Sequence, residues 1–334
     1  MRAMVLERPG PVETRPLRLT ELPDPVPGPG MLRIRVRACG VCRTDLHEVE
    51  GELAPRGGPC IPGHEIVGTV DAAGPGAGAQ LPVGTRVGVP WLNSTCGACH
   101  HCREGRENLC EQARFTGYDV PGGYAQAVLA PEAFALPLPA GMADIAVAPL
   151  LCAGIIGYRA LRLSEMRSGE TLGLYGFGAS AHLCIQIARA QGGTVFVFTR
   201  TPEHATLARA LGAAWAGTAP ETPPAPLQRA ILFAPAGALV PEALRVLDRG
   251  GTVVLAGIHM SEIPPLDYAK HLYLEKTLRS VTAATRRDAT ELLELAACLP
   301  LRSEVETFPL ADANEALLRL KRSEIRGAAV LTMG

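Results

Sequence analysis

Four cysteines within fifteen residues constrain the fold of this chain more than any other feature. They follow the spacing C-x2-C-x2-C-x7-C and are Cys96, Cys99, Cys102 and Cys110. Two-residue spacers let one loop wrap its thiolates around a single metal ion, and four thiolates complete the tetrahedral shell that zinc prefers. We therefore predict a structural zinc site rather than a catalytic one. An iron–sulfur cluster and chance clustering are the alternatives.

Length and composition indicate a soluble protein of two domains. The chain has 334 residues, of which 47% are hydrophobic and 19% are charged, and its net charge is −1. This is enough apolar material for a full core, and the charge balance argues against nucleic acid or an anionic membrane as a partner. The longest apolar run, residues 145–158, is too short to span a bilayer. We expect a cytoplasmic protein, in which cysteines more often bind metal than form disulfides.

Short β-type segments fill the first part of the chain. Residues 33–38 alternate charged and apolar side chains, as a half-buried strand does, and residues 66–70 and 86–89 are similar. Turns rich in glycine and proline separate these segments. The pattern predicts a small β barrel or sandwich over residues 1–90, with strands again over 124–138.

Strand and helix patterns alternate after about residue 150. The expected strands are 171–175, 194–198, 230–233, 252–256 and 278–282, with helices over 180–191 and 202–211. Such alternation predicts a parallel, doubly wound sheet. Two more helices, 287–298 and 311–322, precede a last strand at 328–332. We place a β-rich domain at 1–147, completed by 286–334, and a nucleotide-binding domain at 148–285.

A glycine-rich turn lies between the strand 171–175 and the helix that follows it. Its sequence is Gly176-Phe177-Gly178-Ala179-Ser180-Ala181. In this context Gly176 permits the tight turn, and Gly178 lets the backbone approach a pyrophosphate, whose charge the helix N-terminus stabilises. We predict a dinucleotide site that includes Ala179 and Ser180.

The residues after the next strand indicate which nucleotide binds. The glycine fingerprint expects an acid about twenty residues on, to bind the ribose 2′-hydroxyl, but Thr199 and Arg200 stand there. A carboxylate would repel a 2′-phosphate, whereas arginine binds it with charge-assisted hydrogen bonds. We therefore predict a preference for NADP(H), with NAD(H) possible; the alternative is a solvated arginine at a strand end.

Three further segments contain metal-ligand residues far apart in the sequence. They are Gly40-Val41-Cys42-Arg43-Thr44-Asp45-Leu46-His47, Gly63-His64-Glu65 and Leu151-Cys152-Ala153-Gly154. Spacing alone does not join them, since a lone cysteine is more often a small buried hydrophobe. Together with the four-cysteine loop and the glycine turn, they resemble the zinc-containing medium-chain alcohol dehydrogenases, near the branch of bacterial cinnamyl-alcohol-dehydrogenase relatives. The resemblance covers nearly the whole chain and implies an α/β fold, with a GroES-like catalytic domain and a Rossmann domain.

The resemblance also implies a catalytic zinc site. Its ligands are Cys42, His64 and Cys152, which leave one coordination position open, as catalysis requires. Asp45 corresponds to the carboxylate that accepts the other ring N–H of the zinc histidine, and Glu65 to an acid behind the zinc. For both acids the alternative is an ordinary surface position.

The same resemblance assigns roles to four more residues. Thr44 and His47 occupy the positions of the proton relay, Arg43 that of a pyrophosphate contact and Trp91 that of an aromatic wall of the substrate cleft. Each has a simpler alternative, such as a surface position for Arg43 or His47 and a core position for Trp91. Polyol dehydrogenases carry a glutamate ligand where this chain has Ala148-Pro149. This departure favours alcohols over polyols, and the zinc-free quinone reductases lack the ligands altogether.

The expected activity is reversible hydride transfer between an alcohol and NADP(H), in a homodimer or homotetramer. One alternative is an NADPH-dependent reductase of bulky or aromatic aldehydes, which would use the same site. Another is a non-catalytic, nucleotide-binding zinc protein. The intact ligand triad, together with Thr44 and His47, argues against the latter, since a sensor needs no open zinc position.

Overall fold

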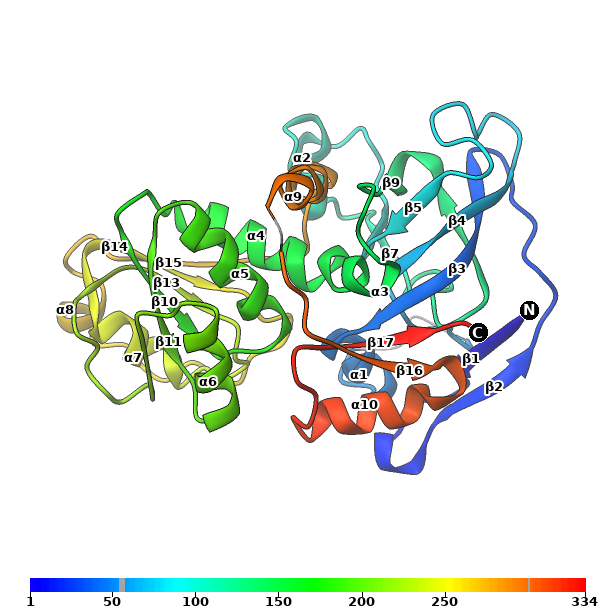
Figure 1. Ribbon diagram of the computed structural model, residues 1–334. Coiled ribbons are helices and arrows are strands. Elements are labelled where there is room, and N and C mark those ends of the chain that lie inside the picture. The colour runs from blue at the N-terminus through cyan, green and yellow to red at the C-terminus, as the bar shows by residue number, and fades with distance from the viewer. Residues whose placement is uncertain (54–57, 300) are drawn as a thin grey trace. The chain divides into compact units, whose positions relative to one another are not determined.

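The computed structural model describes residues 1–53, 58–299 and 301–334 (Figure 1). These residues form two compact units. The first unit comprises Met1–Cys152 and Thr285–Gly334, and the second comprises Ala153–Ala284. Cys152 is thus part of the first unit, with the other two predicted ligands of the catalytic zinc.

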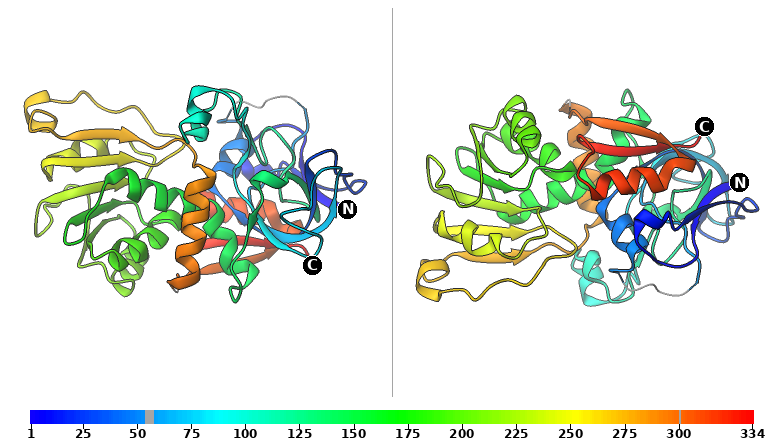
Figure 2. Two further views of the ribbon diagram at one scale, coloured as in Figure 1. Left: turned by 90° about the horizontal axis from the view of Figure 1, so that it is seen from above. Right: turned by 90° about the horizontal axis from the view of Figure 1, so that it is seen from below.

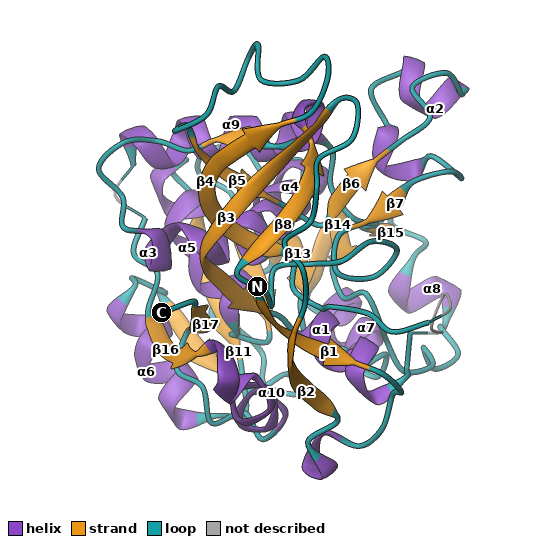
Figure 3. Cartoon of the chain, turned by 90° about the vertical axis from the view of Figure 1, so that its right-hand side faces the viewer, coloured by secondary structure: helices purple, strands orange, loops and turns teal. Residues whose placement is uncertain are grey.

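A seven-stranded sheet forms the centre of the first unit. Its order is β16-β17-β3-β4-β5-β9, and β8 also pairs with β3. The predicted alternation in residues 33–38 is confirmed, because β3 (Met31–Val41) turns alternate side chains into the core. Figure 3 shows β3 beside β4 (Glu65–Ala73), and these two strands pair antiparallel. The remaining strands of this unit are β1 Arg2–Leu6, β2 Leu17–Glu21, β5 Arg86–Val89, β6 Leu92–Ser94, β7 Arg114–Phe115, β8 Ala127–Pro131, β9 Leu136–Pro137, β16 Val305–Pro309 and β17 Ala328–Thr332.

One helix of this unit lies where only strands were expected. Helix α1 (Arg43–Glu50) begins directly after β3, and the carboxylate of Asp45 accepts the backbone N–H of Cys42 at 2.8 Å, as in a capping box. The sequence pattern, which predicted a β-rich region over residues 1–90, did not indicate this helix. The other helices are α2 His100–Arg103, α3 Asp144–Val147, α9 Arg286–Cys298 and α10 Ala313–Lys321, with 3-10 turns at Val12–Thr14, Glu107–Leu109, Glu132–Phe134, Ala148–Leu151 and Leu310–Asp312.

The second unit confirms the predicted doubly wound sheet. All six strands are parallel, in the order β12-β11-β10-β13-β14-β15. This is the 3-2-1-4-5-6 order of dinucleotide-binding folds, and helices pack against the sheet (Figure 2). The strands are β10 Thr171–Tyr175, β11 Thr194–Phe198, β12 Trp215–Gly217, β13 Leu227–Leu232, β14 Leu247–Leu255 and β15 Thr277–Ser280. The helices are α4 Ala153–Ser164, α5 Ala179–Ala190, α6 Pro202–Ala210, α7 Leu239–Arg245 and α8 Tyr268–His271.

Each unit has its own apolar core. In the first unit the core lies against β3 and β4 and includes Ile34, Ile66 and Tyr124, and in the second unit it includes Phe196, Leu232 and Val253. Among the described residues, no single helix is long and apolar enough to cross a membrane. One bent pair of consecutive helices, Asp144–Leu151 with Ala153–Ser164, meets that test by length and composition only.

Candidate metal centres and nucleotide site

The antiparallel pairing of β3 with β4 brings the first group of metal-ligand residues together. Gly40 pairs with Glu65, so Cys42 at the end of β3 lies near His64 at the start of β4. Cys152 follows the 3-10 turn Ala148–Leu151 of the same unit. The ligand-type atoms of Cys42, His64, Glu65 and Cys152 all lie within 4.8 Å of one another. The structure therefore gathers the three predicted zinc ligands, with Glu65 beside them.

The donor set of this group fits a zinc ion. The two sulfur atoms of Cys42 and Cys152 are 3.7 Å apart, and two thiolates on tetrahedral zinc, with Zn–S near 2.3 Å, would be about 3.8 Å apart. Their hydrogen bond lowers the pKa of the Cys42 thiol well below its usual value and raises that of Cys152. Nε2 of the fully buried His64 makes no hydrogen bond of ordinary geometry. It is a nitrogen that a metal would satisfy.

Asp45 fixes the orientation of His64. One carboxylate oxygen of Asp45 lies 3.0 Å from Nδ1 of His64, and the other accepts the N–H of Cys42 at 2.8 Å and the hydroxyl of Tyr124 at 2.9 Å. Burial acts to lower the pKa of His64, but the charge of Asp45 and their hydrogen bond raise it well above its usual value. When the ring is neutral, the carboxylate beside Nδ1 favours the proton on that nitrogen, which leaves Nε2 as the ligand atom.

Glu65 packs against Gly40, where any side chain would displace it. A Cβ atom on Gly40 would lie 1.7 Å from Oε2 of Glu65. Glu65 is 3% exposed and Asp45 is fully buried, so neither acid is a surface residue. The absence of a side chain at Gly40 thus gives the Glu65 carboxylate its place beside the cysteine–histidine group.

Helix α1 places Thr44 and His47 on one face, because residues three apart are neighbours on a helix. Both side chains are buried, and Oγ1 of Thr44 lies 3.6 Å from the sulfur of Cys42. Nδ1 of His47 contacts the carboxylate of Glu52. Sequence reasoning did not find Glu52, which belongs to no motif. The feature that could have indicated it is the glycine and the acid directly after the helix.

Trp91 lies beside the metal-ligand group. Its ring packs edge-on against the imidazole of His64, with centroids 4.8 Å apart, and stacks on Phe115 at 5.0 Å and on Tyr118 at 6.0 Å. An aromatic wall therefore borders His64, as the substrate-cleft interpretation requires.

A second acid that sequence reasoning missed is Glu48. It is 4% exposed, and neither of its carboxylate oxygens has a hydrogen-bond partner among the described residues. Burial and the nearby charge of Asp45 raise the pKa of Glu48 well above its usual value. No sequence motif marks this position; a charged residue on the buried side of α1 is recognisable only once the helix is known.

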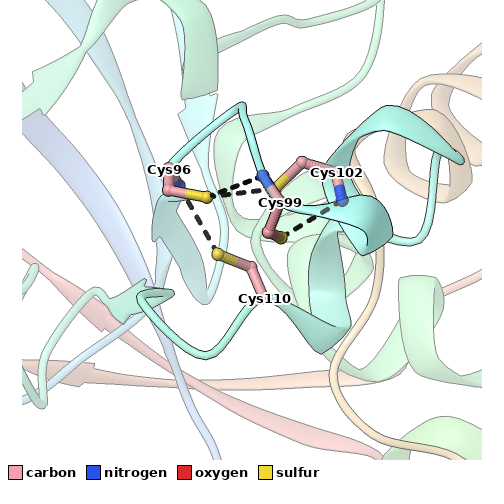
Figure 4. A group of neighbouring side chains, drawn as sticks. All are labelled: Cys96, Cys99, Cys102 and Cys110. Atoms are coloured by element: carbon pink, nitrogen blue, oxygen red, sulfur yellow. Dashed lines mark hydrogen bonds between the residues drawn. The ribbon is translucent and has the colours of Figure 1, made fainter.

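The four-cysteine loop forms the second metal-ligand group (Figure 4). The ligand atoms of Cys96, Cys99, Cys102 and Cys110 lie within 4.8 Å of one another. The sulfur of Cys96 accepts the backbone N–H groups of Ala98 at 3.4 Å and Cys99 at 3.3 Å, which lowers the pKa of Cys96 to about 6. N–H groups that point at sulfur stabilise a thiolate, so the loop is suited to a cation.

An ion pair connects this loop to helix α9. Nη2 of Arg286 donates to Oε2 of Glu107 at 2.6 Å, and its backbone N–H donates to Oε1 at 2.9 Å. The Arg286 guanidinium also lies over the ring of Phe134, 4.4 Å from the centroid. The loop is therefore anchored to α9 by a charged, partly buried contact.

The predicted glycine turn lies between β10 and α5 in the second unit. Gly176 has a φ of +85°, and a Cβ there would lie 3.0 Å from Ala234, so glycine is required at this position. Gly178 is the N-cap of α5 and offers no side-chain cap to the first N–H groups. A Cβ on Gly178 would meet nothing within 4 Å. The uncapped helix N-terminus and the open backbone fit a phosphate group.

Thr199 and Arg200 follow the carboxyl end of β11, next to this turn. The backbone N–H of Gly176 donates to the carbonyl of Phe198 at 2.8 Å, which joins the two strand ends. Arg200 is exposed. The predicted contact residue Arg43 is also exposed, and its guanidinium donates to the carbonyl of Leu320 at 3.4 Å.

Comparison with known proteins gives consistent matches over the chain. Residues 28–140 match the model of the alcohol dehydrogenase GroES-like domain, and residues 181–297 match the model of the zinc-binding dehydrogenase. The chain is 50% identical to the probable alcohol dehydrogenase AdhA of Mycobacterium tuberculosis, over 99% of this chain and 97% of that protein.

Two solved structures show the same fold over nearly their whole length. A cobalt- and zinc-bound thermostable alcohol dehydrogenase from Pyrobaculum aerophilum has a TM-score of 0.91 and 27% identity, covering 100% of this chain and 99% of that one. Acetophenone reductase from Geotrichum candidum, in complex with NAD, has a TM-score of 0.89 and 27% identity, covering 99% of this chain and 97% of that one.

Proposed function

The chain belongs to the zinc-dependent medium-chain alcohol dehydrogenase family and acts on a small-molecule alcohol, and we propose that it does so with a zinc ion on Cys42, His64 and Cys152 and with NADP(H). The observation that carries this proposal is the gathering of three ligand atoms from distant segments within 4.8 Å. Two thiolates and one imidazole leave one of four tetrahedral positions open.

When bound, the zinc supplies Lewis acidity toward the alcohol oxygen, and the nicotinamide accepts or donates the hydride. The protein's part is to hold and orient these groups. Asp45 keeps the proton of His64 on Nδ1, so that Nε2 faces the metal. Tyr124 and the N–H of Cys42 hold Asp45 in turn. The negative charge of Glu65, buried beside the three ligands, balances a cation there.

Thr44 and His47 form the proposed path for the alcohol proton. The Thr44 hydroxyl, 3.6 Å from the sulfur of Cys42, lies where it can accept a proton at the metal-ligand group. His47, one turn along the same buried face, then moves the proton toward solvent. A helix face is suited to this path because it holds both side chains in a fixed relation.

The four-cysteine loop is the proposed site of a second, structural zinc ion. Four thiolates fill the tetrahedral shell and leave no position for a substrate. Its N–H···S hydrogen bonds stabilise thiolates, and its own apolar cluster of Leu92, Ala113 and Phe134 packs beside the cysteines. We therefore expect two zinc ions per chain.

The proposed preference for NADP(H) rests on Thr199 and Arg200. No acid stands at the end of β11, and the exposed Arg200 supplies a positive charge near the glycine turn. Arginine matches a 2′-phosphate with two hydrogen bonds. Arg43, which is exposed and donates to the carbonyl of Leu320 at 3.4 Å, is the proposed partner of the pyrophosphate.

Trp91 supports a substrate of flat or bulky shape. Its ring, with those of Phe115 and Tyr118, forms an aromatic wall beside His64. Such a wall favours an aromatic alcohol or aldehyde by offset stacking. The aromatic wall therefore favours reduction of a bulky aldehyde as the physiological reaction, at the same site and with the same cofactor.

A homodimer is the proposed assembly. Strand β15 is an edge strand of the parallel sheet, and its unpaired backbone groups can pair with those of a second copy. Tyr268 and Tyr273, 66% and 65% exposed, precede it in the chain. Size measurement in solution tests this assembly.

Metal analysis combined with an assay at 340 nm tests the central proposal. The purified enzyme should hold two zinc ions per chain and reduce NADP with an alcohol. Cys42→Ser should hold one ion and lose turnover, whereas Cys298→Ser, at an exposed cysteine outside both groups, should keep two ions and full activity. A Cys42→Ser enzyme with both ions and normal turnover would refute the assigned catalytic site.

A further inference from the structure

At the end of helix α1, His47 of the proposed proton path pairs with an acid, Glu52, to which the mechanism above gives no role. Nδ1 of His47 contacts the carboxylate of Glu52. The side chain of His47 is 10% exposed, and that of Glu52 is 49% exposed. The pair therefore joins the buried face of α1, where Thr44 lies, to solvent.

The backbone after α1 is folded so as to bring these two side chains together. Gly51, the C-cap, has a φ of +79°, a conformation that glycine adopts at no steric cost. The N–H groups of Glu52 and Leu53 both donate to the carbonyl of His47, at 2.9 and 3.2 Å. The chain thus turns back over the last helical turn, and Glu52 is held against the histidine by its main chain as well as by its side chain.

We propose that Glu52 is a positioning residue of the proton relay and acts through His47. Its carboxylate holds the proton of the neutral imidazole on Nδ1, so that Nε2 is the nitrogen that accepts the proton from Thr44. This inference rests on the proposed function, because the relay through Thr44 and His47 is part of it.

The step balances as a proton transfer: the O–H bond of the donating hydroxyl breaks as an N–H bond forms at Nε2, the imidazolium then loses one proton to water, and no electrons change hands. Because Glu52 is half exposed, water reaches the pair and removes the proton.

The first test compares two substitutions that remove the same charge at the same end of α1. Glu52→Gln removes the carboxylate beside His47. Glu50→Gln is the matched control, because Glu50 instead accepts the N–H of Val12 at 3.1 Å and pairs with Lys321 at 2.7 Å. We expect kcat to fall about 10-fold in Glu52→Gln, with KM unchanged. This is less than the roughly 100- to 10,000-fold that a general acid or base contributes, because Glu52 acts only through His47. Glu52→Asp should restore part of kcat, and Glu50→Gln should match the wild type.

The second readout does not depend on turnover. In protein labelled with ¹⁵N-histidine, the ring signals of His47, assigned with His47→Gln, show which nitrogen carries the proton. We expect the proton on Nδ1 in the wild type. In Glu52→Gln we expect a mixture of both tautomers of His47. The amide oxygen can accept from a protonated Nδ1, and the amide nitrogen can donate to an unprotonated one. A wild-type tautomer together with a wild-type kcat in Glu52→Gln would overturn the inference.

His47→Gln separates this inference from the proposed function. A normal kcat in His47→Gln would remove the relay, and the role of Glu52 with it. A slow His47→Gln enzyme beside a normal Glu52→Gln enzyme would leave the relay in place and overturn only the role of Glu52. Slow turnover in both variants, with an altered His47 tautomer in Glu52→Gln, is the expected result.

Discussion

Nδ1 of His64 lies 3.0 Å from Oδ1 of Asp45, and both side chains are fully buried. A buried carboxylate at this distance decides which ring nitrogen bears the proton. Since Asp45 also holds the N–H of Cys42, one side chain orients two of the three proposed zinc ligands. The geometry of this metal site therefore depends on a residue that does not itself bind the metal.

Asp45→Asn should weaken zinc binding without removing a ligand. The amide lacks the charge that holds the proton on Nδ1, and losses of such partners typically reduce metal affinity about 10- to 100-fold. The measurement is zinc retained against a graded chelator, read by metal analysis. Asp71→Asn is the control, because Asp71 pairs with Arg33 and Arg35 away from the cluster. Equal zinc retention in both variants would contradict the role of Asp45.

Gly40→Ala should destabilise the first unit. The new Cβ would lie 1.7 Å from Oε2 of Glu65, so the acid must move from its buried position. Overpacking of this kind typically costs about 1–3 kcal/mol. Gly28→Ala is the control, since a Cβ there meets nothing within 4 Å. Thermal unfolding should show a lower Tm for Gly40→Ala only, and Glu65→Ala should restore part of the loss. A Tm equal to that of the control would show that Glu65 relaxes freely.

The ion pair of Glu107 with Arg286 should make stability depend on pH. Burial opposes ionisation, but the hydrogen bonds from Arg286 prevail and lower the pKa of Glu107. A lowered folded-state pKa stabilises the folded state above the unfolded value, about 4.3, and this contribution is lost as the pH falls through the folded value. Glu107→Gln should therefore have a lower Tm than the wild type at pH 7, with the difference shrinking in acid.

Glu104→Gln is the control for this pH dependence. Glu104 pairs with Arg106 on the exposed side of the same loop, where solvent screens the charges. We expect its Tm to follow the wild type at every pH. A Tm difference for Glu107→Gln that stays constant from pH 7 to pH 4 would show that the carboxylate stabilises the loop by packing rather than by charge.

Much of the fold follows from local patterns in the sequence. All five predicted strands of the second unit correspond to strands of the parallel sheet, four of them mostly buried and the edge strand β15 only partly buried. Helix α1 escaped prediction for a physical reason. It buries polar residues, among them Asp45, His47 and Glu48, so its sequence lacks the apolar period of a surface helix.

The metal-ligand group depends on long-range strand pairing, which the spacing of residues in the sequence does not reveal. Cys42 and His64 meet because β3 and β4 pair with Gly40 opposite Glu65. Only the resemblance to known dehydrogenases connected these residues at the level of sequence. Glu48 and Glu52 have no such motif, and their surroundings become visible only when α1 and the turn after it are in place.

Arg200→Asp should shift cofactor use toward NAD(H). The substitution places a carboxylate at the end of β11, where it would accept hydrogen bonds from a ribose hydroxyl and repel a 2′-phosphate. In the wild type we expect a higher kcat/KM with NADP than with NAD, and in Arg200→Asp we expect the reverse. Arg249→Asp, at another exposed arginine of the same unit, makes the same change of charge and should leave the preference unaltered. A shift of equal size in both variants would mean that overall charge, rather than a contact of Arg200, sets the cofactor preference. Wild-type enzyme that uses NAD better than NADP would refute the assignment directly, because Thr199 and Arg200 would then not select for a 2′-phosphate.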